Sequence, residues 1–199
     1  MSIDTLQIPV QPEPFEFELQ HFAQSLRNGG LVNIVALGSS TTAGEGGIAP
    51  YPSRLQALLT DQYSTVAINV INRGIGGQEA PAELERMRVD VIDQKPSLVI
   101  WQVGTNAVWQ PADQHPPTFD ATTDAIQEGL SLLLATNTTD VILMDLQYVP
   151  ALLTPAKRVV AKRMVIAIGE IARKTRVNVF RRFALMKAWH QIEIGRAHV

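Results

Sequence analysis

Short apolar runs alternate with amphipathic segments along almost the whole chain, and this alternation is the feature that most constrains its fold. The runs are mostly continuous, which is typical of strands covered on both faces. Strands that alternate with helices favour a parallel sheet with a helix in each crossover. The predicted strands are residues 31–37, 66–71, 97–103, 140–144 and 177–180. The predicted helices are residues 15–27, 52–63, 80–93, 124–135, 155–174 and 184–190.

Composition limits the possible functions only broadly. The chain has 199 residues, 46% of them hydrophobic and 18% charged, which fits a single globular domain. The net charge of −2 gives no electrostatic reason to expect a nucleic-acid partner. The absence of cysteine excludes disulfides, thiolate nucleophiles and zinc–thiolate sites. No stretch reaches the roughly 18 consecutive apolar residues of a membrane span. The oligomeric state stays open.

We expect three segments along the chain. Residues 1–13, with three prolines, form an extended arm, and residues 14–193 form the folded domain. Residues 194–199, IGRAHV, match the translation of a sequencing adapter, so we expect a non-native tail there. The first residues lack the basic and apolar regions of a signal peptide. The cytoplasm is therefore the default location, with export open if Met1 is not the true start.

The glycine-rich turns that follow the predicted strands fail the motifs of several common sites. The turn after the first strand has no lysine in a phosphate-binding position, and Gly74-Ile75-Gly76-Gly77 does not match Gly-x-Gly-x-x-Gly. Ser40 is also not part of a Gly-x-Ser-x-Gly elbow. These failures disfavour a nucleotide-binding domain.

Three blocks in order do match a known pattern. They are GSSTTAG at residues 38–44, NRGIGG at residues 72–77 and GTN at residues 104–106, each at the end of a predicted strand. Together they resemble the SGNH (GDSL-like) hydrolase family. Two later segments are also similar, MDLQYVP after the fourth strand and VFRRFALMKAW around the fifth. Two positions differ from the family pattern: Ser39 and Ala107 stand where aspartate is usual.

The resemblance implies a fold and a chemistry. The fold is a three-layer α/β/α sandwich, flavodoxin-like, with five parallel strands in the order 2-1-3-4-5. The chemistry is ester hydrolysis with Ser40 as the catalytic nucleophile and no metal or cofactor. The backbone N–H groups of Ser40 and Gly77 and the side-chain amide of Asn106 would form the oxyanion hole, which needs two or three fixed donors. The substrate would be a small-molecule, carbohydrate or lipid ester, as for a lipase, esterase or carbohydrate O-deacetylase.

Simpler interpretations of these residues remain open. Ser40 could cap the following helix, as serine often does. Gly77 could be required only for a positive φ, and Asn106 could close a local turn through its side chain. In that case the chain would be a non-catalytic ligand-binding domain on the same fold.

The general base of the resemblance is missing. The family supplies it as Asp-x-x-His near the C-terminus, where aspartate orients the histidine that takes the serine proton. None of the four histidines, His21, His115, His190 and His198, has aspartate three positions earlier. Glu18-x-x-His21 is the nearest imitation but precedes the first strand. The sequence therefore predicts a weak or inactive hydrolase, lacking the general base and its orienting aspartate.

Overall fold

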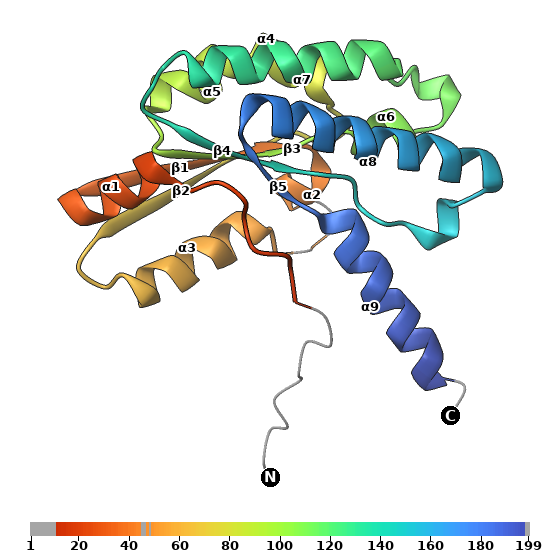
Figure 1. Cartoon of the computed structure of the whole chain (residues 1–199), viewed down its shortest axis with the longest axis horizontal. Coiled ribbons are helices and arrows are strands. Elements are labelled where there is room, and N and C mark those ends of the chain that lie inside the picture. Colours follow the sequence, from red (N-terminus) through yellow and green to blue (C-terminus); the bar gives the residue numbers. More distant parts are fainter. Residues whose placement is uncertain (1–10, 45–46, 48, 198–199) are drawn as a thin grey trace.

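Five parallel strands form the centre of the computed structural model, which describes residues 11–44, 47 and 49–197, without the side chains of residues 193–197 (Figure 1). The strand order is β2-β1-β3-β4-β5, so the predicted order is confirmed. The residues on either side of β1 show its central place, because Val35 pairs with Ile71 of β2 and with Val99 of β3. The strands are β1 (Leu31–Gly38), β2 (Ala67–Gly74), β3 (Leu98–Gln102), β4 (Asp140–Met144) and β5 (Asn178–Phe180).

Helices lie on both faces of the sheet, which makes the predicted three-layer sandwich (Figure 1). One face carries α4 (Ala80–Glu85), α5 (Met87–Asp90), α7 (Phe119–Leu134) and α8 (Pro155–Thr175). The other face carries α1 (Gln20–Asn28) and α3 (Tyr51–Gln62). Two short helices follow strands directly, α2 (Ser40–Ala43) after β1 and α6 (Thr105–Trp109) after β3. Helix α9 (Arg182–Ala197) follows β5 and extends away from the sheet. Short 3-10 turns cover Ile92–Gln94, Ala112–Gln114 and Pro150–Leu152.

The alternation of side chains along each strand divides the core in two. We call the α4/α5/α7/α8 side the closed face; Leu37, Trp101 and Leu143 project into it and are fully buried. We call the α1/α3 side the open face, onto which Ile100 and Ile142 project. Between α3 and the start of α9 this face borders a cavity of about 480 Å³. Its lining is Phe15, Thr41, Ala49, Tyr51, Leu55, Ile100, Ile142, Met144, Phe180 and Arg182.

Four predicted helices differ from those observed, the last of them because α9 covers Arg182–Ala197 rather than residues 184–190. The first begins at Gln20 rather than residue 15, because Phe17 instead exchanges hydrogen bonds with the side-chain amide of Asn178, the first residue of β5. The predicted helix at 80–93 is broken into α4, α5 and a 3-10 turn. The predicted helix at 124–135 begins at Phe119, because the Thr118 hydroxyl accepts from the N–H of Ala121 and caps it there.

The expected terminal segments lie mostly outside the described residues. The arm at residues 1–13 is described only from residue 11, and the tail at residues 194–199 is described only as the backbone of α9 up to Ala197. Among the helices of the described residues, none combines the length and apolar character needed to cross a bilayer.

Candidate active site

The predicted site residues lie on three turns that leave the same edge of the sheet. Ser40 opens α2 directly after β1, Gly77 lies in the turn after β2, and Asn106 lies in α6 after β3. Because all three strands are parallel and adjacent, their carboxyl ends meet at one edge, where ligands bind in open α/β sheets.

Ser40 does not cap the helix that it begins. The N-cap position of α2 is Ser39, and no side chain caps the helix. The Ser39 hydroxyl is buried and accepts from the Gln102 side-chain amide, with 2.9 Å between Nε2 and Oγ. Within the described residues the Ser40 hydroxyl makes no hydrogen bond, and its residue is partly exposed. The capping interpretation is therefore wrong.

Close packing places α2 against the end of β2. A Cβ on Gly74 would overlap the backbone of Ala43, so only glycine permits this approach. The Asn72 side chain then donates from Nδ2 to the Thr42 carbonyl oxygen at 2.8 Å and accepts from the Gly74 N–H at 2.9 Å. These contacts explain the Asn-x-Gly of the second block, because they hold the turn of Ser40 against the next strand.

Gly77 and Asn106 are joined through a single residue. Asn106 donates from Nδ2 to the Gln78 carbonyl oxygen at 2.6 Å, rather than closing a turn of its own. Gly77 has a φ of +77°, which favours glycine, and its carbonyl oxygen accepts from Gln110 Nε2 at 2.9 Å. In the described part of the chain, the backbone N–H groups of Ser40 and Gly77 donate to no protein acceptor. An amide nitrogen has two hydrogens, so Asn106 also keeps one donor.

A buried carboxylate that the sequence analysis missed lies beneath this pair. Glu79 accepts four backbone N–H groups: Oε1 from Ala80 at 3.0 Å and from Gly104 at 2.7 Å, and Oε2 from Asn106 at 2.8 Å and from Ala107 at 3.2 Å. Burial raises its pKa, and the four donors oppose that rise. Four donors around one carboxylate favour the charged form.

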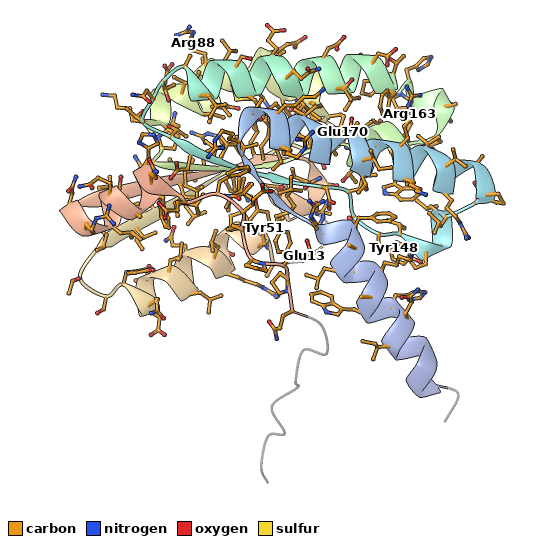
Figure 2. All side chains as sticks on the ribbon, viewed as in Figure 1. Glu13, Tyr51, Arg88, Tyr148, Arg163 and Glu170 are labelled. Carbon is orange, nitrogen blue, oxygen red and sulfur yellow. The ribbon has the colours of Figure 1, made fainter. Side chains whose placement is uncertain are left out.

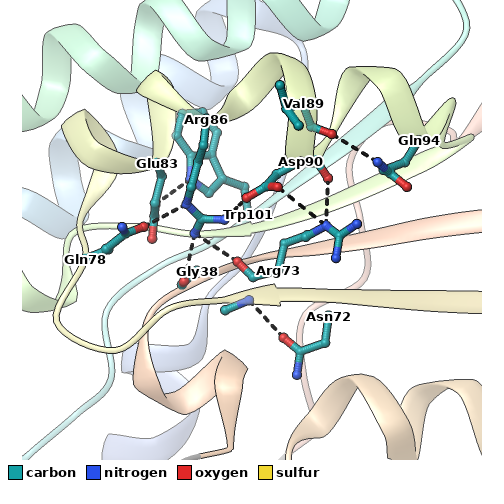
Figure 3. Close-up of polar contacts among 11 residues, drawn as sticks. Gly38, Asn72, Arg73, Gln78, Glu83, Arg86, Val89, Asp90, Gln94 and Trp101 are labelled. Carbon is teal, nitrogen blue, oxygen red and sulfur yellow. Dashed lines mark hydrogen bonds and ion pairs between the residues drawn. The ribbon is translucent and has the colours of Figure 1, made fainter.

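Glu83, one helical turn further along α4, is also buried but has a different environment. Its Oε2 accepts from Trp101 Nε1 at 2.7 Å, while Oε1 has no partner (Figure 3). Burial first, and then the negative charge of Glu79, raise the pKa of Glu83 to about 8. Glu83 therefore keeps its proton near neutral pH, whereas the four N–H donors around Glu79 favour its charged form.

Arg86 holds the ends of β1 and β2 next to the turn of Gly77. The sequence analysis did not identify this residue either. Its guanidinium donates from Nη2 to the carbonyl oxygens of Arg73 at 2.9 Å and Gly38 at 3.5 Å, and from Nε to Gln78 Oε1 at 2.7 Å (Figure 3). An ion pair with Asp90 at 2.7 Å compensates its charge. One side chain thus joins the ends of β1 and β2 to the turn that carries Gly77.

Arg182, which lies on the open face, links the turn of Ser40 to the turn of Asn106. It donates from Nη1 to Thr41 Oγ1 at 3.4 Å and from Nη2 to Thr105 Oγ1 at 3.1 Å, next to Ser40 and Asn106 respectively. Burial lowers its pKa to about 10. Tyr51, at the start of α3, lines the same cavity (Figure 2). Its hydroxyl has no hydrogen-bond partner, and burial raises its pKa.

No described histidine contacts Ser40. His21 lies on α1 beside Asp140 at the amino end of β4, which is the opposite edge of the sheet. His115 ends an exposed 3-10 turn, and the His190 ring lies 5.8 Å from that of Tyr148. His198 lies outside the described residues. Among the described residues, no three His, Asp or Glu side chains lie close enough together to bind a metal ion.

Comparison with known proteins identifies a family and similar folds. The model of the Non-GDSL lipase-like family matches residues 7–195. By structure, the chain is similar to Axe2, an acetylxylan esterase from Geobacillus stearothermophilus, with 23% identity, a TM-score of 0.67 and 81% of each chain covered. It is also similar to a mutant of the esterase AlinE4, with 23% identity, a TM-score of 0.60 and 78% of each chain covered. Catalytic mutants of Axe2 replace a serine, an aspartate or a histidine with alanine. No curated protein matches by sequence.

Proposed function

The chain belongs to the Non-GDSL lipase-like family, and from this premise we propose that it is a serine ester hydrolase of the SGNH type with Ser40 as nucleophile. The observation that carries the proposal is the arrangement of unused donors. The N–H groups of Ser40 and Gly77 and one hydrogen of the Asn106 amide remain available at the edge where the free Ser40 hydroxyl lies. Two or three fixed donors are what a tetrahedral oxyanion requires.

The proposed reaction has two steps. Ser40 Oγ attacks the ester carbonyl carbon while its proton passes to a base, and the former carbonyl oxygen takes the negative charge beside the three donors. Collapse of this intermediate expels the alcohol, which recovers a proton, and leaves an acyl-serine. Water then attacks the acyl-serine in the same manner, releasing the carboxylic acid and free Ser40.

None of the described histidines supplies a general base for Ser40. Because no described histidine contacts Ser40, we expect hydroxide or water to accept the proton, and turnover to be slow. Oxyanion stabilisation and binding alone can still leave roughly a 10³-fold acceleration over water. With no described histidine bonded to the Ser40 hydroxyl, we expect the rate to rise with pH and to show no plateau near neutrality.

Similarity to Axe2 favours esters of carbohydrates as the substrate class. Axe2 is described as an acetylxylan esterase and an acetyl-xylooligosaccharide esterase, and we propose a small acyl group, such as acetate, for this chain by that similarity. Simple aryl acetates are suitable probes, because their leaving group needs no protonation.

The test is hydrolysis of p-nitrophenyl acetate by the wild type and by Ser40→Ala. We expect Ser40→Ala to abolish the protein-dependent rate, because the acyl acceptor is gone. Ser53→Ala is the matched control: Ser53 is an exposed serine of α3 whose hydroxyl donates to the Pro50 carbonyl, and it should hydrolyse like the wild type. Equal rates for Ser40→Ala and the wild type would leave only a ligand-binding domain.

A further inference from the structure

Glu79 makes more hydrogen bonds than its place at the start of a helix requires. It is the N-cap residue of α4, and one of its oxygens accepts the N–H of Ala80 within that helix. An N-cap side chain ordinarily accepts only from N–H groups in the first turn of its own helix. The other three bonds cross to a different turn, at Gly104, Asn106 and Ala107. The residue is 5% exposed, so these bonds are shielded from water.

We propose that Glu79 is a positioning residue of the oxyanion hole, holding the turn of Gly77 and the turn of Asn106 in fixed register. This inference rests on the proposed function, because it gives the carboxylate a purpose in ester hydrolysis. Glu79 lies two residues after Gly77 and its side chain accepts from the backbone N–H of Asn106, so one residue connects both donor segments. Gln78, between Gly77 and Glu79, receives the Asn106 side chain.

The two contacts on Asn106 constrain different parts of the residue. Glu79 Oε2 holds its backbone, and the Gln78 carbonyl oxygen holds its side-chain amide at 2.6 Å. With both fixed, the remaining amide hydrogen has a defined direction before substrate arrives. Donors preorganised in this way stabilise a developing oxyanion without having to reorient during the reaction. Loss of the Glu79 anchor should therefore reduce turnover more than substrate binding.

Glu83 provides a matched control on the same helix. Both carboxyls are buried, Glu79 at the N-cap of α4 and Glu83 one turn into it, but Glu83 contacts Trp101 and not the turn of Asn106. Glu83→Gln replaces a group that is already neutral at pH 7 with a neutral one of similar shape. Glu79→Gln instead points an NH₂ group at backbone N–H donors, so part of the four-bond contact must break.

The experiment measures kcat and KM for Ser40-dependent p-nitrophenyl acetate hydrolysis, together with amide hydrogen exchange, at pH 7. For Glu79→Gln we expect kcat to fall by about ten- to a hundredfold, with KM changed less than about twofold. Exchange should accelerate at the amides of Gly104, Asn106 and Ala107. Glu83→Gln should match the wild type in kcat, KM and exchange. Glu79→Asp keeps the charge on a shorter side chain and should recover part of kcat.

Each outcome bears on one proposal. A folded Glu79→Gln with unchanged kcat overturns the positioning role, as does an equal loss of kcat in Glu83→Gln, which would indicate general destabilisation. If Glu79→Gln does not fold, Glu79→Asp decides: unchanged kcat and unchanged exchange at Asn106 overturn the role. Absence of any Ser40-dependent rate in the wild type overturns the proposed function instead, whereas unaltered exchange in both Glu79 variants overturns the anchor itself.

Discussion

The two faces of the sheet are covered unequally. On the closed face, the helices α4, α5, α7 and α8 bury Trp101 and Leu143 completely, and even the polar Glu83 is excluded from water. On the open face, α1 and α3 leave a cavity of about 480 Å³ whose walls include Ile100 and Ile142. The same strands supply both faces, so the difference arises from the helices and not from the sheet.

This difference separates the two halves of the proposed site. Gly77 lies shortly before α4 and Asn106 lies within α6. Both donors are next to the buried Glu79, which accepts from the N–H groups of Gly104 and Asn106. Ser40 and Thr41 lie nearer the cavity of the open face, where Arg182 has an unpartnered Nε and Tyr51 an unpartnered hydroxyl. In the proposed reaction, the fold would therefore preorganise oxyanion stabilisation more completely than proton removal from Ser40.

The largest expected effect comes from truncating neighbouring residues of β4 that point to opposite faces. Leu143→Ala should lower the unfolding free energy by about 2–5 kcal/mol, because the surrounding closed face cannot collapse onto the space left. Ile142→Ala should cost clearly less, since its side chain already borders a cavity. Urea denaturation of both variants measures the difference. Equal losses would show that the open face is packed as tightly as the closed one.

A smaller effect concerns the pH dependence of stability. The pKa of Glu83 is about 8 in the folded chain, raised from its ordinary value by burial. Above the ordinary pKa the unfolded chain loses this proton while the folded chain keeps it, so stability falls as pH rises toward 8. The slope is at most about 1.4 kcal/mol per pH unit. Glu83→Gln removes this contribution, so its stability relative to the wild type should grow between pH 5 and pH 8.

The raised pKa of Asp145, about 6, has the same sign but is present in both proteins and cancels in the comparison. Parallel stability curves for the wild type and Glu83→Gln over this range would contradict the assignment of the proton to Glu83.

The strands and the turn residues could be predicted from the sequence for a physical reason. Continuous apolar runs report burial on both faces, and glycine reports positions where backbone must approach closely, as at Gly74 against Ala43. The break of the helix at Arg86 could not be predicted in this way. It depends on a guanidinium that bonds to the ends of two other strands, and no glycine or proline at the break signals it.

Glu79 and Glu83 left a weaker signal that could have been used. Two glutamates four residues apart repel each other on a solvated helix, so their spacing on α4 suggests an unusual environment. The partners of Glu79 come from the turn after β3, which becomes adjacent only when the sheet forms. The role of Arg182 could not be predicted for the same reason. Its contacts with Thr41 and Thr105 form only because β5 ends next to the turns of those residues.

The most direct test of the account is reaction of the folded chain with a fluorophosphonate, followed by mass spectrometry of the digested protein. We predict a single phosphonylated site at Ser40, formed slowly and faster at higher pH, and absent after Ser40→Ala. Asn106→Ala should slow the labelling, because the phosphonyl oxygen occupies the position of the oxyanion. Labelling at other serines to the same extent, or none at Ser40 at any pH, would contradict the assignment of Ser40 as the nucleophile.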